Sequence, residues 1–269
     1  MTATAFQFDD VTFAYRTQRA LEGVSLTIRS GERVALLGAN GSGKSTLLRM
    51  MDALCFPASG TATAFAAPLT EAAFQDDATN YAFRRRVGLV FQNPDVQLFN
   101  PTVSDELAFG PLQLGWEKPK VRDAVDTVSA RFGIAHLKDR PPHRLSGGEK
   151  KRVALASVLI TEPDVLLLDE PTAALDPASR ANLVGFLARE PGAGRTVVTA
   201  THDLDIVEDI ADRAIVLAEG RVVADGPVLA VLHDVDLLRR THLVFEHRHS
   251  HGGPPAGSHG HMHSSRQEG

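Results

Sequence analysis

Residues 33–51 decide the fold; they read Arg33-Val34-Ala35-Leu36-Leu37, then Gly38-Ala39-Asn40-Gly41-Ser42-Gly43-Lys44-Ser45-Thr46, then Leu47-Leu48-Arg49-Met50-Met51. The first part is a short apolar run typical of a buried strand, and the last part has the apolar spacing of a helix. Between them stands a complete G-x-x-x-x-G-K-[ST] loop, in the strand–loop–helix context that phosphate binding requires. A glycine turn before an ordinary helix is the alternative, and a match at every motif position argues against it. The loop alone therefore predicts nucleotide binding.

The same motif predicts what its residues do with a nucleotide. Its glycines let backbone N–H groups turn toward the β- and γ-phosphates, where the N-terminus of the following helix also favours negative charge. Lys44 is expected to neutralise charge that develops on the phosphates, and Ser45 to place its hydroxyl on Mg²⁺. The predicted nucleotide-binding residues of this loop are Gly38, Asn40, Gly41, Ser42, Gly43, Lys44, Ser45 and Thr46.

A second apolar run, residues 165–168, ends in two carboxylates, Asp169 and Glu170. Because Asp169 follows four leucine or valine residues, we expect it at the exit of a buried strand, within reach of Mg²⁺. Glu170 is placed to orient and deprotonate an attacking water. A solvated acidic strand end is the alternative, and the continuation Pro171-Thr172-Ala173-Ala174-Leu175-Asp176 argues against it.

The composition argues against several other classes of protein. The chain has 269 residues, of which 43% are hydrophobic and 23% charged, as is ordinary for a globular protein. A formal net charge of −5 leaves no global basic footprint, so no nucleic-acid partner is expected. The single cysteine, Cys55, cannot form an internal disulfide framework. No run approaches the roughly 18 apolar residues that cross a bilayer, and no signal peptide is recognised, so we expect any membrane role to act through partner proteins.

The remaining patterns predict the order of the elements. Alternating apolar and polar residues over 6–28 predict antiparallel strands, and residues 60–80 are expected to form weak strands and loop. Helix formers dominate residues 103–160. Strand-like runs at 165–168, 196–199 and 214–217 then alternate with helical ones, which indicates a largely parallel sheet with crossover helices.

The stretch Leu145-Ser146-Gly147-Gly148-Glu149-Lys150-Lys151-Arg152 resembles the family-defining motif of ATP-binding cassette (ABC) ATPases. It stands between the phosphate loop and the acidic strand end, and the resemblance runs from about residue 6 to about residue 231. It implies an α/β fold: a P-loop NTPase core with a RecA-like, mostly parallel sheet and helices, plus an antiparallel β subdomain and an α-helical subdomain. The cassette is expected over residues 1–240, with the helical subdomain at about 95–160.

The resemblance also implies roles for residues outside the loop. Tyr15 would stack on adenine, Gln92 would connect the Mg²⁺ site with the transporter interface, and His202 would contact the γ-phosphate. A core position for Tyr15 and a helix-start position for His202 are the alternatives. The predicted catalytic residues are thus Lys44, Gln92, Glu170 and His202, and the predicted Mg²⁺ residues are Ser45, Gln92 and Asp169.

The same family motif implies a stoichiometry. Ser146, Gly147 and Gly148 would meet the nucleotide bound by an opposing subunit, and Asp176 would cross the interface between the subunits. Since the chain holds one cassette with both halves intact, a homodimer with two complete sites is the simplest arrangement.

Residues 90–99, Val90-Phe91-Gln92-Asn93-Pro94-Asp95-Val96-Gln97-Leu98-Phe99, resemble one branch of the family, the ATPases of energy-coupling-factor transporters and especially the cobalt/nickel group. The resemblance implies uptake of cobalt or nickel with integral membrane partners, at the cytoplasmic face of the cell membrane. Val96, Leu98 and Phe99 are expected to carry closure of the site to a docked membrane helix, unless they pack inside the helical subdomain. An importer of a vitamin or another small solute is the alternative, and a soluble ABC ATPase outside transport is a more distant one.

The composition changes near Thr241, and residues 241–269 are rich in Gly, Pro, Ser and His. Alternating histidines suit nickel, cobalt, copper and zinc, while residues 252–255, Gly-Gly-Pro-Pro, argue against a fixed fold. A solvated tail without a metal role, or a remnant of cloning, is the alternative. The candidate metal ligands of the tail are His247, His249, His251, His259, His261 and His263.

Overall fold

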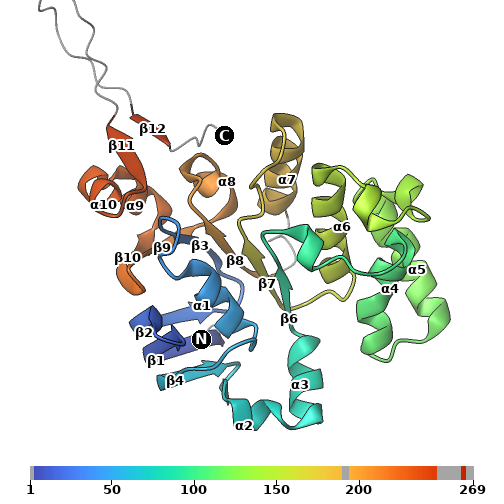
Figure 1. Ribbon diagram of the computed structural model, residues 1–269, viewed down its shortest axis with the longest axis horizontal. Coiled ribbons are helices and arrows are strands. Elements are labelled where there is room, and N and C mark those ends of the chain that lie inside the picture. The colour runs from blue at the N-terminus through green and yellow to red at the C-terminus, as the bar shows by residue number, and fades with distance from the viewer. Residues whose placement is uncertain (1–2, 190–193, 247–261, 265–269) are drawn as a thin grey trace, which may run out of the picture.

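The computed structural model describes residues 3–189, 194–246 and 262–264, with a central sheet flanked by helices (Figure 1). The strands of this sheet lie in the order β10-β9-β3-β8-β7-β6, and all neighbours are parallel except β10 and β9. This confirms the predicted α/β fold with a mostly parallel sheet. The strands are β3 (Arg33–Leu37), β6 (Val87–Val90), β7 (Val165–Asp169), β8 (Thr196–Thr201), β9 (Arg213–Ala218) and β10 (Arg221–Pro227).

The two faces of the central sheet bury two separate cores. Because successive side chains of a strand point to opposite faces, Val165 and Leu167 of β7 join one core while Leu166 and Leu168 join the other. The first core packs against α1 (Lys44–Met51), and the second against the helices that follow β6. Because β7 is buried on both faces, its sequence is a continuous apolar run instead of an alternating one.

A small antiparallel sheet closes the first core, in the order β2-β1-β4-β5. Its long strands are β1 (Thr4–Tyr15) and β2 (Gln18–Arg29), so the antiparallel strands predicted over residues 6–28 are confirmed. Phe6 and Phe8 of β1 point inward and are buried in the same core as Leu47 and Leu48 of α1. The remaining strands are β4 (Ser59–Ala64) and β5 (Ala67–Pro68).

The turn between β4 and β5 contains no glycine. Phe65 and Ala66 both adopt left-handed backbone angles, with φ of 51° and 67°. A left-handed non-glycine residue costs about 1–2 kcal/mol, so packing must compensate. The Phe65 ring lies 6.1 Å from that of Phe6, and the Arg86 guanidinium lies 3.4 Å above it. The turn therefore forms without a glycine because these tertiary contacts hold it in place.

The prediction for residues 60–80 is wrong beyond Pro68, because two short helices follow it. These are α2 (Glu71–Phe74) and α3 (Asp77–Arg84). Each begins at a side chain that caps it: Thr70 Oγ1 accepts a hydrogen bond from Ala73 N, and the Asp76 carboxylate accepts one from Thr79 N. Such short helices depend on packing and caps more than on apolar periodicity, which is why the periodicity did not indicate them.

Helices cover the second core and extend it away from the sheet (Figure 1). The first three are α4 (Val103–Gln113), α5 (Lys118–Arg131) and α6 (Gly147–Leu159), preceded by the 3₁₀ turn η1 (Pro94–Val96). Further 3₁₀ turns, η2 (Ala135–Leu137) and η3 (Pro142–Arg144), lie between α5 and α6. The helix α7 (Pro177–Arg189) follows β7, and η5 (Leu204–Ile206) and α8 (Val207–Ile210) follow β8. The last helices, α9 (Val228–His233) and α10 (Val235–Arg240), follow β10.

The packed chain continues past residue 240, where the composition changes. Thr241, Leu243 and Val244 are all buried, and the Thr241 hydroxyl donates a hydrogen bond to the carbonyl of Leu237. The boundary expected at 240–241 therefore lies too early, because a composition shift does not reveal that the first residues after it still pack on α10. The described chain ends with β11 (Val244–Glu246) and β12 (Met262–Ser264), which pair antiparallel.

Of the tail histidines, only His263 falls in a described element, β12, opposite Phe245 of β11. His247, His249, His251, His259 and His261 lie outside the described residues. Within the described ranges, no group of three His, Cys, Asp or Glu side chains could hold a metal ion. A search of the same ranges finds no helix with the length and apolar character needed to cross a membrane.

Candidate active site

The predicted phosphate loop connects the carboxyl end of β3 with the first turn of α1. A Cβ atom on Gly38 would lie 2.4 Å from the carbonyl oxygen of Leu217 and 2.4 Å from Ser42 Oγ. A Cβ on Gly43 would lie 2.6 Å from the carbonyl oxygen of Ala20. Since real Cβ atoms do not approach other atoms so closely, the loop can take this compact shape only with glycines at both positions.

Two groups inside the loop fit an anionic ligand. Ser42 Oγ is buried and has no hydrogen-bond partner among the described residues. Lys44 is buried too, and its ammonium donates to the carbonyls of Gly38 at 2.7 Å and Ala39 at 3.2 Å. Burial lowers the pKa of Lys44, and the nearby carboxylate of Glu170 opposes this effect. A buried cation beside an unpaired hydroxyl, at the N-terminus of a helix, is suited to phosphate.

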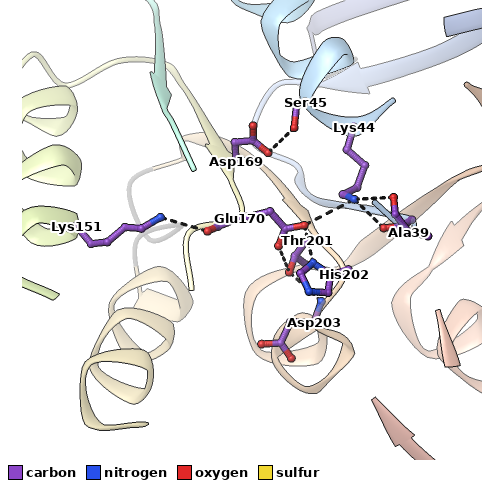
Figure 2. Close-up of polar contacts among 10 residues, drawn as sticks. Ala39, Lys44, Ser45, Lys151, Asp169, Glu170, Thr201, His202 and Asp203 are labelled. Atoms are coloured by element: carbon purple, nitrogen blue, oxygen red, sulfur yellow. Dashed lines mark hydrogen bonds and ion pairs between the residues drawn. The ribbon is translucent and has the colours of Figure 1, made fainter. Parts of the chain in front are cut away.

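Ser45 and Asp169 meet although they are far apart in the chain. Ser45 Oγ, in the first turn of α1, donates to Asp169 Oδ1 at 3.0 Å from the end of β7 (Figure 2). Burial raises the pKa of Asp169, while the hydrogen bond from Ser45 acts in the opposite direction. A hydroxyl and a carboxylate oxygen at this spacing are the hard ligands that Mg²⁺ prefers.

Glu170 is the centre of the cluster. Its Oε1 lies 2.8 Å from His202 Nδ1 and 3.6 Å from Lys44 Nζ, and its Oε2 accepts from Thr201 Oγ1 at 3.3 Å. Figure 2 shows this carboxylate pointing toward Lys44 and His202 from the exit of β7. The carboxylate is buried, whereas His202 stands partly exposed at the rim. The structure therefore brings together three of the four predicted catalytic side chains.

Gln92, the fourth, lies outside this cluster. Its side chain is exposed, and no hydrogen bond of the described residues joins it to Ser45 or Asp169. Its backbone carbonyl accepts a hydrogen bond from Lys151 Nζ of α6. The structure thus places Gln92 at the junction of the sheet and the helical region, connected to Glu170 only through Lys151 among the described contacts.

Tyr15 lies at the tip of the β1–β2 hairpin and is 43% exposed, so the alternative of a core aromatic is wrong. Its ring meets that of Phe13 edge-on at 4.9 Å, and Arg49 of α1 donates to its hydroxyl at 3.4 Å. The contact with Arg49 places this ring beside α1, the helix that follows the phosphate loop. An exposed aromatic in this place fits the stacking role that the sequence predicts for Tyr15.

The family motif forms the start of α6. Ser146 caps this helix: its hydroxyl accepts from Glu149 N at 3.3 Å, and the Glu149 carboxylate accepts from Ser146 N at 2.8 Å. Gly148 lies against α7, where a Cβ would meet Ser179 Oγ at 2.7 Å. In Figure 1, α6 and α1 lie on opposite sides of β7. Ser146, Gly147 and Gly148 are therefore not brought to the phosphate loop of their own chain.

Asp176 directly precedes α7 and is exposed. Its Oδ1 accepts hydrogen bonds from Ala178 N at 3.1 Å and Ser179 N at 3.0 Å. Through Ser179 it adjoins the family motif, because that side chain also faces Gly148. The exposed Asp176 and Ser146 thus lie on neighbouring loops.

Two residues near the carboxylates were not predicted. Thr201 donates to Glu170, and Lys151 donates to the carbonyl oxygens of Gln92 and Glu170. The only signal for Thr201 was its place before His202 at a strand end. Lys151 stands in a run of three basic residues, where nothing local indicates that the middle one is buried.

The comparisons with known proteins agree with this geometry. Residues 21–173 match the family described as ABC transporter. The chain is 59% identical to the nickel import ATP-binding protein NikO of Rhodobacter capsulatus, over 89% of this chain and 96% of that protein. It is 45% identical to the energy-coupling factor transporter ATP-binding protein EcfA of Methanoculleus marisnigri, over 87% of this chain and 83% of that protein.

Solved structures give the same result. CbiO1 from Clostridium perfringens, part of the ABC transporter complex CbiONQ, matches with a TM-score of 0.75 and 37% identity, over 90% of this chain and 95% of that one. The cassette MJ0796, solved as a dimer with ADP and phosphate, matches with a TM-score of 0.75 and 27% identity, over 83% and 98%. A family match over more than half of the chain, a relative 59% identical and this fold lead to one conclusion: the chain belongs to the ABC transporter family and is one of its ATP-binding, ATP-hydrolysing subunits.

Proposed function

We propose that this chain powers an importer of nickel or cobalt and hydrolyses ATP at the cluster of Lys44, Glu170 and His202. The observation that carries the catalytic part is the position of Glu170 Oε1, 2.8 Å from His202 Nδ1 and 3.6 Å from Lys44 Nζ. The buried Glu170 carboxylate thus faces both Lys44, the cation that would bind the phosphates, and the partly exposed His202.

In the proposed reaction, the loop amides and Lys44 hold the phosphates of ATP. Ser45 and Asp169 would hold Mg²⁺, with Gln92 as a further ligand, and the ion supplies charge neutralisation at the phosphate oxygens. Glu170 orients a water for attack on the γ-phosphorus and takes one of its protons as the bond to ADP breaks. His202 and Lys44 stabilise the charge on the transferring phosphoryl group. Tyr15 stacks on the adenine.

The second half of each site comes from a second copy. Ser146 and Gly147 are exposed, and α6 packs on the face of the central sheet opposite α1, so Ser146, Gly147 and Gly148 are available to a partner's nucleotide, with Asp176 crossing beside them. The dimeric structures of the relative MJ0796 support this arrangement.

A patch on the helical region fits a membrane partner. Phe99 and Val96 are 66% and 67% exposed, and Phe109 and Leu112 of α4 are 39% and 46% exposed. The Phe99 and Phe109 rings meet edge-on at 5.0 Å, so the patch is continuous there. Leu98, in contrast, is buried in the helical core, as the alternative for these residues allowed. The patch begins at Val96, three residues after Asn93 and four after Gln92, so it lies next in the chain to the segment proposed to sense the nucleotide.

The cargo assignment rests on relatives and on the tail. The relative from R. capsulatus is named as a nickel importer subunit, and the tail carries imidazole ligands suited to nickel and cobalt. We place the chain at the cytoplasmic face of the membrane, attached through integral membrane subunits. The cassette is assigned to the packed chain that ends near residue 246, with the helical subdomain at about 95–160.

Phe99→Ser should abolish nickel uptake while leaving hydrolysis by the isolated chain intact, because Phe99 is exposed and its described contacts are with Phe109 and Glu106, not with Lys44, Glu170 or His202. Uptake of radioactive nickel by cells that carry the transporter, with cobalt as competitor, measures transport. Co-purification of the membrane subunits measures docking. Leu229→Ser is the matched control, since Leu229 is an exposed apolar residue of α9. Normal uptake by the Phe99 variant would contradict the docking patch, and wild-type cells that accumulate neither metal would contradict the cargo.

Deletion of residues 247–269 removes β12 together with the tail histidines, and it should remove most nickel binding while leaving the melting temperature nearly unchanged. A cut at 246 keeps the buried Thr241, Leu243 and Val244, whereas a cut at 240 would expose apolar surface and destabilise the chain. Binding should weaken as pH falls through about 6.5, the unperturbed imidazole pKa, because only neutral imidazole binds the metal. Calorimetry of both chains at several pH values tests this. Equal binding by the shortened chain would show that the tail is not the site.

A further inference from the structure

Lys151 is a buried lysine without a carboxylate partner. It lies in α6 and is 7% exposed, and none of the ion pairs among the described residues includes it. Its Nζ donates instead to two backbone carbonyls, those of Gln92 and, at 3.3 Å, Glu170. Burial lowers the pKa of Lys151 to about 8, although the charges of Asp169 and Glu170 oppose this. Burying the charged ammonium costs free energy, so a lysine at this position is expected to have a structural or functional role.

Glu170 has a backbone that needs such a partner. Its φ is 45°, in the left-handed region that costs a non-glycine residue about 1–2 kcal/mol. Its N–H donates to the carbonyl of Ala200 at 2.9 Å, and its own carbonyl accepts from Lys151. Figure 2 shows Lys151 approaching from the side opposite the carboxylate. Lys151 therefore does not touch the reacting atoms but holds the peptide that aims the carboxylate.

The other carbonyl belongs to a segment fastened along α6. Lys150 pairs with Asp95 at 2.7 Å, and Gln97 Nε2 donates to the carbonyl of Ala154 at 2.8 Å. Gln97 Oε1 in turn accepts from Phe91 N at 3.1 Å. Residues 91–97 and α6 are thus joined at several points, and a shift of the segment that carries Gln92 involves α6. Among these contacts, Lys151 is the one that also reaches Glu170.

We propose that Lys151 is a positioning residue that ties the orientation of the Glu170 carboxylate to the segment of Gln92. Displacement of that segment, by the membrane partner or by the nucleotide, shifts the ammonium and releases the strained Glu170 peptide from its hydrolytic orientation. The inference rests on the proposed role of Glu170 and adds to it a mechanical connection from the docking patch to the catalytic base.

Lys151→Met in the full-length chain should lower kcat about 10- to 100-fold, the size of effect that a misplacement of about 1 Å produces, and leave KM for ATP within about twofold. The variant should fold, because Met keeps the apolar stem and Lys151 borders cavities of ≈ 410 Å³ and ≈ 350 Å³. Lys150→Met is the matched control: it removes a neighbouring lysine and one contact to the same segment but none to Glu170, and should keep kcat within about twofold. Lys151→Arg, which retains charge and donors, should recover most of the loss.

A double variant separates this inference from the role of Glu170 itself. If Lys151 acts through Glu170, adding Lys151→Met to Glu170→Gln should not lower the residual single-turnover rate further. Additive losses, an unchanged kcat in Lys151→Met, or an equal loss in Lys150→Met would each overturn the proposal. If Lys151→Met does not fold, Lys151→Gln takes its place. A loss of kcat at a normal melting temperature and KM, recovered in Lys151→Arg, supports positioning. Normal kinetics in Lys151→Gln refutes it. Near-normal hydrolysis by Glu170→Gln would refute the proposed function instead.

Discussion

Glu170→Gln is expected to lower ATP hydrolysis by about 10²–10⁴-fold, the usual effect of losing a general base. Glutamine has nearly the same shape, so it can keep the contacts with Thr201 and His202 that position the side chain. It cannot take a proton from water. It also removes the negative charge 3.6 Å from Lys44, which leaves this cation free for the phosphates, so affinity for ATP should be kept or raised. A dimer with uncleaved ATP should accumulate.

Phosphate release at saturating ATP measures the loss, and size-exclusion chromatography with ATP and Mg²⁺ measures the dimer. Glu106→Gln is the matched control, because Glu106 is also buried and its Oε2 accepts hydrogen bonds from Phe99 N and Asn100 N, which do not belong to the catalytic cluster. This control should hydrolyse ATP at a rate close to that of the wild-type chain. Near-normal turnover by the Glu170 variant would move the role of base to another residue, with His202 the first to test.

The parts of the site that could be predicted from sequence are those where a short stretch sets the geometry. The phosphate loop needs glycines at 38 and 43 because backbone and side-chain atoms occupy the place of a Cβ. Asp169 and Glu170 end a strand that is buried on both faces, so their exit point is evident from four preceding apolar residues. In both cases neighbouring residues carry the whole signal.

The parts that were missed depend on residues distant in the chain. Lys151 is buried because Gln92 and Glu170, 59 and 19 residues away, place their carbonyls at its ammonium. The left-handed turn at Phe65 is held by Phe6 and Arg86, so no glycine marks it. Val244 counts as core because α10 packs beneath it, although a polar tail follows. No local propensity encodes such contacts.

Ser146→Arg is expected to abolish ATP-dependent dimerisation while leaving ATP binding by a single subunit within about twofold. Ser146 is exposed and caps α6, which packs on the face of the central sheet opposite α1, so we expect the change to leave the nucleotide of the same chain untouched. In the dimer the new side chain would enter a closed interface beside the partner's γ-phosphate, where its bulk leaves no room for the loop to approach. We expect this steric exclusion to outweigh any attraction between the arginine and the phosphate, because the backbone N–H groups of Gly147 and Gly148 would no longer reach the phosphate.

The substitution also removes the cap of α6, which costs about 1 kcal/mol, and this effect must be separated from the interface. Ser146→Ala loses the same hydroxyl, and with it the bond to Glu149 N, but adds no bulk, so it should still dimerise, though more weakly. Both variants are best placed in the Glu170→Gln background, where uncleaved ATP holds the dimer long enough for analytical ultracentrifugation. Fluorescent ATP titrated into each monomer gives the affinity of the single subunit. If Ser146→Arg instead lost monomer binding and kept its dimer, the start of α6 would act on its own nucleotide, and two complete sites would no longer require two copies.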